Sequence, residues 1–505
     1  MTTKERWLSE NTQLYVGWQD RTEYGGPIGN RIELRLRELF ADTIAAIDHG
    51  DNPIGPDMVT KLRNIFRSEK FAPYVAGNGE TDRSCGWRLN AAVLHPEPAL
   101  TRLHQLTVMT EDKQVAITIQ PAQWAPLHAA VAALTGPGLV PDNISDPDIR
   151  QLIQALDSNG YLQKTRQAAC GRAACGRAPH TIASAAGATL VGHACVLIRG
   201  RNSAVLVDPY MPVGSGEWPP DYQPLKISEL GRIDAVLLTH GHPDHFDAAT
   251  LLRIPTETPI VVPQVDRESI LSPDLQMRLH QLGFTDVRAR PWGACEKFGD
   301  IVVEVLPFYG EQPSVGAVLH PEISMAGNTY VVETGWGRVA LLADAGDDRR
   351  GRMIDVARRE REVDGPVDIV FSGFRGWCTS PAELLGSSVG RYALFIPPHR
   401  WGSREELMND PWRAVTTTSA FGARTLVPYA DGGAPWFWEV GLGPRLDETA
   451  AERPGFDLYP EQVAAEAARE GAVRVAVMRA GETLEPDHSV TQHPGHVWPW
   501  RSLNA

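Results

Sequence analysis

Apolar and polar residues alternate with two different periods along the chain. Up to about residue 165, apolar residues recur with the period of amphipathic helices, as in IELRLRELFADTIAAI, MVTKLRNIF and IRQLIQALDSNGYL, and the clearest strand signal there is QVAITIQ. Later, short β-branched runs such as TLVGHACVLIRG, DAVLLTH, DIVVEVLPF and VDIVFSGF alternate with helical stretches. This pattern predicts a mostly helical region followed by an α/β body built on sheets.

A stretch of small and polar residues separates these two regions. The sequence SNGYLQKTRQAACGRAACGRAPHTIASAAGAT has the composition of a linker or an exposed crossing segment. We therefore expect a mostly helical N-terminal domain over residues 1–180, an α/β domain over residues 181–445 and a C-terminal extension over residues 446–505. The extension holds one helical stretch, PEQVAAEAAREGA, and says little about function.

The composition narrows the class of protein. Of the 505 residues, 43% are apolar and 22% are charged, which is ordinary for a soluble globular protein. A net charge of −14 opposes nucleic acid or an anionic membrane surface as the partner, because both are negatively charged. Six scattered cysteines fit a reducing compartment, and neither a signal peptide nor an apolar run of about 18 residues is found. We expect a cytoplasmic protein that does not span a membrane.

The most specific signal is the sequence THGHPDH at residues 239–245, which follows the apolar run from Ala235 to Leu238. Three imidazoles and one carboxylate in the turn that leaves a buried strand can point at one small volume. So many titratable groups together need a cation as their partner. Satisfied surface histidines are the weaker interpretation, since charged loops seldom repeat His at this spacing. The sequence predicts a metal site.

This motif resembles that of the metallo-β-lactamase superfamily, and the resemblance covers roughly residues 185–445. Further landmarks of the family stand in the expected order: GHA at residues 192–194, DP at 208–209, LLADAG at 341–346 and IPPHR at 396–400. The resemblance implies an α/β fold of the αββα sandwich type, with a two-metal catalytic centre in the domain over residues 181–445.

The resemblance also implies a ligand set, position by position. It consists of His240 and His242 for metal one, Asp244 and His245 for metal two, Asp344 as the bridge and His399 as the last ligand of metal two. His193, in the GHA strand, is expected to pack near the centre rather than to bind a metal, although a ligand role stays open.

The chain departs from the family at the remaining ligand of metal one, which is usually a histidine in the turn after a strand. Here the predicted strand from Ile301 to Phe308 leads into Tyr-Gly-Glu, so Glu311 takes that place. His320 and Glu322 are nearby alternatives, and the sequence leaves the choice open. In the simplest reading, Glu311 only caps a turn.

A carboxylate in place of an imidazole favours iron or manganese over zinc. The PFYGE ending resembles a small branch of non-haem di-iron oxygenases in antibiotic biosynthesis, typified by the chloramphenicol-pathway arylalanine β-hydroxylase. That resemblance implies two iron ions, with two Zn or Mn as the alternative, and catalytic roles for Asp244 and Glu311. It also implies an external electron donor and an aminoacyl substrate on a nonribosomal peptide synthetase carrier domain, to which the N-terminal domain would dock. A homodimer is left open.

Aromatic and cationic residues beside predicted strand ends are candidates for substrate binding. They occur in FRGW at residues 374–377, in HRW at 399–401 and in LVPYADGG at 426–433. We select Trp377, Arg400 and Tyr429. The alternatives are a structural ion pair for Arg400, which is the more common role of such an arginine, and a plain hairpin turn for Tyr429.

Two other functions compete with hydroxylation. A di-metal hydrolase would attack an ester, thioester, lactone or phosphoester with a metal-activated hydroxide that Asp244 orients. A metal-stabilised scaffold without activity would lack ligands, whereas every ligand position is filled here. Residue 311 discriminates between the two enzymes: ligation by Glu311 favours the oxygenase, and ligation by His320 favours the hydrolase.

Overall fold

The structure is a computed structural model, and it describes most of the chain from residue 186 to residue 492 together with separate elements before it. The described residues are 6–8, 13–19, 75–76, 88–89, 103–110, 113–119, 127, 130, 147–158, 162–164, 186–211, 225, 227–242, 244–266, 272–312, 324–376, 378–379, 405–430, 460–471 and 473–492.

The first of two large sheets has eight strands, in the order β13-β12-β11-β10-β9-β8-β25-β26. Strands β10 to β13 run parallel to one another, and the remaining pairs are antiparallel. The bounds are β8 Gly187–Gly192, β9 Cys195–Arg199, β10 Ala204–Val207, β11 Ala235–Leu237, β12 Ile260–Pro263, β13 Val287–Arg290, β25 Glu482–Leu484 and β26 Val490–Gln492.

The second sheet has seven strands, in the order β14-β15-β16-β17-β20-β23-β24. Strands β14 to β17 form an antiparallel meander, and β17, β20, β23 and β24 run parallel. The bounds are β14 Cys295–Phe298, β15 Ile301–Pro307, β16 Asn328–Thr334, β17 Gly337–Leu341, β20 Ile369–Ser372, β23 Thr425–Pro428 and β24 Arg474–Val475.

Strand β9 illustrates how the sequence pattern produces a layered core. Val196 and Ile198 pack between the two sheets, whereas Cys195 and Leu197 pack on the opposite face of the same sheet, beneath helices. Successive side chains of a strand point to opposite faces, so an unbroken apolar run belongs to a strand that is covered on both sides. The short β-branched runs of the sequence therefore become central strands.

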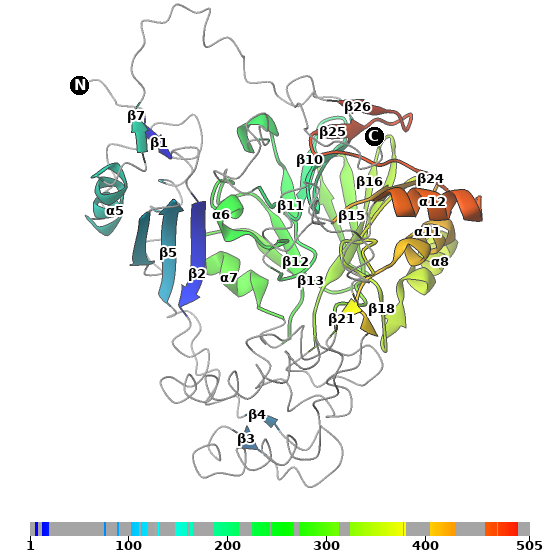
Figure 1. Ribbon diagram of the computed structural model, residues 1–505, viewed down its shortest axis with the longest axis horizontal. Coiled ribbons are helices and arrows are strands. Elements are labelled where there is room, and N and C mark those ends of the chain that lie inside the picture. Colours follow the sequence, from blue (N-terminus) through cyan, green and yellow to red (C-terminus); the bar gives the residue numbers. More distant parts are fainter. Residues whose placement is uncertain are drawn as a thin grey trace, which may run out of the picture.

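Helices cover the outer face of each sheet (Figure 1). Helices α6 (Ala248–Leu251) and α7 (Leu275–Gln281) pack on the first sheet, and α8 (Met353–Val363), α11 (Pro411–Ala420) and α12 (Pro460–Glu470) pack on the second. The four layers confirm the αββα sandwich expected from the sequence. None of the helices in the described part of the chain is long and apolar enough to cross a membrane.

The described elements before residue 186 include more strands than the sequence pattern predicted. The QVAITIQ strand is confirmed as β6 (Lys113–Ile119), which pairs with β5 (Leu103–Thr110), and β5 pairs with β2 (Gln13–Gln19). The last predicted helix is confirmed as α5 (Pro147–Ser158), whereas the stretches IELRLRELFADTIAAI and MVTKLRNIF lie outside the described residues. Two short pairs complete this part: β1 (Arg6–Leu8) with β7 (Leu162–Lys164), and β3 (Val75–Ala76) with β4 (Arg88–Leu89). In Figure 1, β2 lies beside α6.

Residues near the C-terminus complete both sheets. Strand β24 extends the second sheet next to β23, and β25 extends the first sheet next to β8. Residues 474–492 thus belong to the sandwich, although the sequence analysis assigned them to a C-terminal extension.

Candidate metal centre

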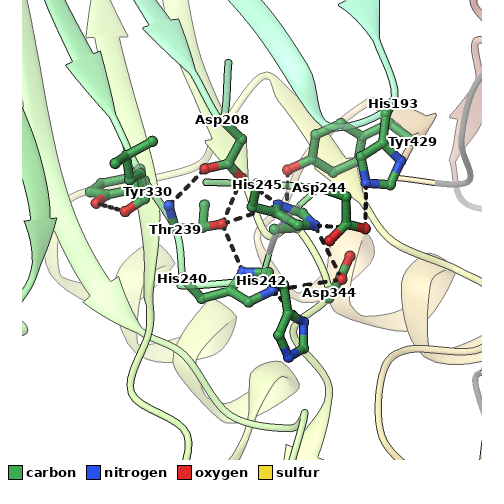
Figure 2. Close-up of polar contacts among 12 residues, drawn as sticks. His193, Asp208, Thr239, His240, His242, Asp244, His245, Tyr330, Asp344 and Tyr429 are labelled. Atoms are coloured by element: carbon green, nitrogen blue, oxygen red, sulfur yellow. Dashed lines mark hydrogen bonds and ion pairs between the residues drawn. The ribbon is translucent and has the colours of Figure 1, made fainter. Parts of the chain in front are cut away.

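The candidate site lies at one edge of the sandwich, where several strands end. Asp208 directly follows β10, the motif at residues 239–245 comes after β11, Glu311 comes after β15, and Asp344 comes after β17. Because β10 and β11 are parallel, their carboxyl ends meet at this edge. Figure 2 shows the side chains of Asp208, His240, Asp244, His245 and Asp344 pointing toward one another.

Backbone contacts shape the turn that carries the histidine motif. His240 forms an isolated antiparallel bridge with Gly327, which ties this loop of the first sheet to the start of β16 in the second. The carbonyl oxygen of His242 then accepts hydrogen bonds from the amides of His245 (3.0 Å) and Phe246 (2.7 Å). The resulting turn brings the imidazoles of the motif to one side.

Asp208 fixes the orientation of two residues of the motif. Its Oδ1 accepts a hydrogen bond from the Thr239 amide (2.7 Å), and its Oδ2 accepts one from the Thr239 hydroxyl (2.5 Å). The same Oδ2 lies 2.7 Å from Nδ1 of His245, and both side chains are fully buried. A carboxylate that holds Nδ1–H leaves the Nε2 lone pair of the imidazole for a metal. In the sequence Asp208 is recognisable only as a landmark of the family, and its orienting role was not predicted.

The structure brings the predicted ligands among the described residues together. His245 Nε2 lies 3.2 Å from Asp344 Oδ2 and 3.9 Å from Asp244 Oδ2, and His240 Nε2 lies 3.8 Å from Asp344 Oδ2. His242 Nδ1 lies 3.0 Å from His240 Nε2. Ligand atoms of His240, His245 and Asp344 all lie within 4.8 Å of one another, a spacing that can hold a metal ion.

Several buried polar atoms at the centre have no hydrogen-bond partner among the described residues. They include His245 Nε2, Asp344 Oδ1 and both carboxylate oxygens of Glu311. Buried polar atoms in folded proteins nearly always have a partner, and burying a charge without one is costly. The donor set of imidazoles and carboxylates therefore fits a bound metal ion.

Glu311 lies in this centre, with its Oε2 3.8 Å from His242 Nδ1. Its backbone has a positive φ of 49°, and its amide donates to the carbonyl oxygen of Leu407 (2.7 Å). The preceding Gly310 has no room for a side chain, because a Cβ there would lie 2.4 Å from the Leu407 oxygen. Within the described residues the Glu311 carboxylate does not cap a turn. The alternatives His320 and Glu322 lie outside the described residues.

A short hairpin supports the turn that carries Glu311. Strands β18 (Asp347–Asp348) and β19 (Gly351–Arg352) pair just after Asp344, and Asp348 Oδ2 accepts a hydrogen bond from the Gly310 amide (3.2 Å). Arg350 donates to Asp348 Oδ2 (2.8 Å) and to the carbonyl oxygen of Phe308 (3.2 Å). The hairpin thereby fixes both sides of the turn.

Tyr429, a candidate for substrate binding from the sequence, packs against the turn that carries Asp344. It is fully buried, and its hydroxyl oxygen accepts a hydrogen bond from the amide of Ala343 (2.7 Å). It therefore supports the turn that carries Asp344 and offers no exposed surface. The other two candidates, Trp377 and Arg400, and the predicted ligand His399 lie outside the described residues.

The imidazoles of the centre differ in their affinity for protons. Burial, and then the neighbouring imidazoles of His245 and His242, holds the pKa of His240 well below its ordinary value. Burial also lowers the pKa of His242. Burial would lower the pKa of His245 as well, but the carboxylates of Asp344 and Asp208 raise it well above its ordinary value. Neutral imidazoles are the form that binds metals.

The pKa values of the carboxylates Glu311 and Asp244 shift in opposite directions. Burial, and then the charges of Asp344 and Asp244, raises the pKa of Glu311 well above its ordinary value. Burial would also raise the pKa of Asp244, but the imidazoles of His245 and His193 hold it well below that value. A raised pKa favours the protonated form of Glu311, and metal binding would require the carboxylate.

Comparisons with known proteins identify the family. The model of the metallo-beta-lactamase superfamily matches residues 188–321. A UPF0173 protein of Pyrococcus furiosus is 31% identical over 210 residues, which are 41% of this chain and 80% of that protein. Together with the αββα fold and the histidine motif, these matches show that the chain belongs to the metallo-beta-lactamase superfamily.

Within the superfamily the chain is similar to a hydroxylase. It is 29% identical over 256 residues to the 4-amino-L-phenylalanyl-(CmlP-peptidyl-carrier-protein) 3-hydroxylase of Streptomyces venezuelae, a match that spans 50% of this chain and 44% of that protein, less than half of its length. The crystal structure of CmlA, a diiron beta-hydroxylase from Streptomyces venezuelae, superposes with a TM-score of 0.61 at 18% identity, over 95% of this chain and 99% of that one. The likeness in sequence and fold confirms the resemblance to this branch.

Proposed function

We propose that this protein is a di-iron, O2-dependent monooxygenase that hydroxylates an aminoacyl group held as a thioester on a nonribosomal peptide synthetase carrier domain. The observation that carries the proposal is the position of Glu311, a carboxylate with both oxygens buried and Oε2 3.8 Å from His242 Nδ1. The relative from Streptomyces venezuelae is named for the hydroxylation of a carrier-bound 4-amino-L-phenylalanyl group, which supports the same class of substrate here.

The donor set suits two divalent ions of iron. In this proposal His240, His242 and Glu311 would hold one ion, Asp244 and His245 would hold the other, and Asp344 would contribute to both. The short distances from Asp344 Oδ2 to His245 Nε2 (3.2 Å) and His240 Nε2 (3.8 Å) support the bridging assignment. Three carboxylates offset most of the charge of two ferrous ions and favour iron or manganese over zinc. His399 stays a predicted ligand of the second ion.

The bound iron pair would supply the O2 chemistry: one oxygen atom enters a C–H bond, and the other leaves as water with two protons and two electrons from an external donor. The chain positions and shields the pair. Asp208 orients His245 through the 2.7 Å contact at Nδ1, and the burial of His240, His245 and Glu311 keeps water from that side of the centre. Hydroxylation needs such exclusion, because water would divert a reactive oxidant.

A di-metal hydrolase is the second candidate, because water can reach part of the centre. The side chains of His242 and Asp244 are 26% and 19% exposed, so a metal-activated water has access on that side. In this alternative Asp244 orients the nucleophile toward an ester, thioester, lactone or phosphoester. Glu311 is the residue whose ligation favours the oxygenase over this alternative.

We also propose that the reaction needs two partners, a carrier protein and an electron donor. A carrier protein delivers the substrate, an external donor supplies the electrons, and the region before residue 180 is the proposed docking platform. A cytoplasmic location and a homodimer stay predictions.

The direct test is hydroxylation of a carrier-bound amino acid. Reduced, iron-loaded protein is mixed with isotopically labelled O2 and with 4-amino-L-phenylalanine loaded on a carrier domain, and the mass of the loaded carrier is measured. We expect the mass to increase by one labelled oxygen atom. Glu311→Gln should abolish the product, and Glu333→Gln, at an exposed site on β16, should not. Release of the amino acid from the carrier without oxygen incorporation would support the hydrolase instead.

A further inference from the structure

His193 occupies an unusual position in the backbone. It forms with Ala194 the two-residue connection between β8 and β9, in which Gly192 pairs with Cys195. Its φ is 49°, in the left-handed region that most side chains avoid and that Gly, Asn and Asp occupy most easily. Residues of tight hairpin turns are usually exposed, yet His193 is 2% exposed. A strained and buried turn residue indicates a role for its side chain.

The imidazole of His193 contacts Asp244. Its Nε2 lies 3.1 Å from Asp244 Oδ2, which is an ion-pair contact (Figure 2). Two edge-on ring contacts hold the imidazole, one with Tyr210 (6.0 Å between centroids) and one with His245 (5.1 Å). The carbonyl oxygen of His193 also accepts a hydrogen bond from the amide of Ala430 (3.3 Å).

The other side of Asp244 faces the candidate metal ligands. In Figure 2, Asp244 lies between His193 and Asp344. Its Oδ2 is closer to His193 Nε2, at 3.1 Å, than to His245 Nε2, at 3.9 Å. A carboxylate oxygen that is paired with an imidazole is a weaker metal donor, so the second oxygen becomes the preferred donor to the metal.

We propose that His193 is a positioning residue of the metal centre, whose imidazole contacts Asp244 Oδ2 through Nε2 and orients the carboxylate that would hold metal two. The inference rests on the part of the proposed function that assigns Asp244 to a metal, and it is independent of the reaction with O2. It also explains why an imidazole stands at a position where the backbone favours glycine or asparagine.

Two substitutions separate the possible roles of His193. His193→Asn keeps a residue that accepts the positive φ but is too short to reach Asp244 as Nε2 does. His193→Gln places an amide N–H near the position of Nε2. His280, an exposed histidine on α7, gives the matched control His280→Asn. Co²⁺ serves as the probe, because its visible spectrum reports coordination number and its binding can be titrated without O2 or substrate.

If His193 positions Asp244, His193→Asn still binds two Co²⁺ per chain, the second about 10- to 100-fold more weakly and with an altered spectrum. His193→Gln should recover most of the affinity, and His280→Asn should match the wild type. In the background of Asp244→Asn, His193→Asn should cause no further loss, since the two residues act as one unit.

Three results would overturn the proposal. Loss of one Co²⁺ site in both His193 variants would make His193 a ligand. Unchanged binding and spectrum in His193→Asn would make it a packing residue, and so would failure of that variant to fold. If the wild type binds two Co²⁺ but its iron form ignores O2, the proposed function fails while the role of His193 is still tested.

Discussion

Nδ1 of the His245 ring lies 2.7 Å from Oδ2 of Asp208, and both side chains are completely buried. This pair connects the strand β10, which precedes Asp208, with the motif that follows β11. The carboxylate fixes the imidazole with Nε2 toward Asp344, so the affinity for metal two should depend on a residue that binds no metal itself.

Asp208→Asn should therefore weaken binding of the second metal about 10- to 100-fold, because it replaces one of two acceptor oxygens by an NH2 donor and cannot serve both Thr239 and His245 Nδ1–H. Calorimetric titration of metal-free protein with Mn²⁺ measures the change. Asp300→Asn, at an exposed hairpin where Asp300 accepts a hydrogen bond from the Arg201 amide, is the control and should leave both binding steps unchanged. Equal affinities of Asp208→Asn and the wild type would refute an orienting role.

Glu311→His should shift the metal preference of the centre from iron or manganese toward zinc, because it restores a nitrogen donor in place of an oxygen donor. Elemental analysis after loading with an equal mixture of Fe²⁺ and Zn²⁺ under anaerobic conditions gives the ratio. Glu333→His is the matched control. A variant with the metal ratio of the wild type would mean that residue 311 does not bind the metal.

The Asp348 carboxylate should matter for stability through its contact with the Glu311 turn. Asp348→Ala removes the acceptor of the Gly310 amide (3.2 Å) and the partner of Arg350 (2.8 Å). We expect a loss of about 1–3 kcal/mol in the free energy of unfolding, measured with urea. Asp355→Ala, which breaks exposed ion pairs on α8, should stay within about 0.5 kcal/mol of the wild type. A larger loss in the free energy of unfolding for Asp355→Ala than for Asp348→Ala would contradict this account.

The raised pKa of Glu304, a residue outside the metal centre, predicts that the stability of the fold depends on pH. Burial on β15, and then the charges of Glu360 and Asp364, raises the pKa of Glu304 to about 7. The folded protein keeps a proton that the unfolded chain releases above the ordinary pKa of glutamate, so this group destabilises the fold as the pH rises toward about 7. Glu304→Gln should remove this part of the dependence.

Thermal melting of metal-free protein across this pH range provides the measurement for Glu304. The melting temperature of Glu304→Gln should exceed that of the wild type increasingly as the pH rises, and the difference should level off above about pH 7. Glu257→Gln, at an exposed site whose charge does not act on Glu304, serves as the control. A difference that shrinks with rising pH would contradict the predicted sign.

The central strands were predictable because they are short apolar runs buried on both faces, as Val196 and Leu197 show on β9, whereas the αββα order of the layers was implied only by the resemblance to the superfamily. The strands near the C-terminus were not predictable, since β24 has two residues and β25 three, too few for a recognisable alternation. Their place depends on pairing with β23 and β8, which a local pattern does not encode.

In the candidate site, too, features encoded by neighbouring residues could be predicted, whereas features that depend on long-range contacts could not. The residues of the motif at 239–245 are neighbours in the chain, so their convergence could be predicted from one turn. The orienting role of Asp208 depends on the parallel pairing of β10 with β11, and the conformation of Glu311 depends on the carbonyl oxygen of Leu407. Such long-range contacts had no local signal, and the burial of Tyr429 behind Asp344 had none either.

The measurement that tests the central claim most directly is the metal content of protein purified from iron-replete cells, combined with its optical response to O2 after chemical reduction. The account predicts two iron ions per chain and a near-ultraviolet absorption that bleaches on reduction and returns with O2. Glu311→Gln should lose this response. Two zinc ions per chain and indifference to O2 would contradict the account and make the hydrolase the better assignment.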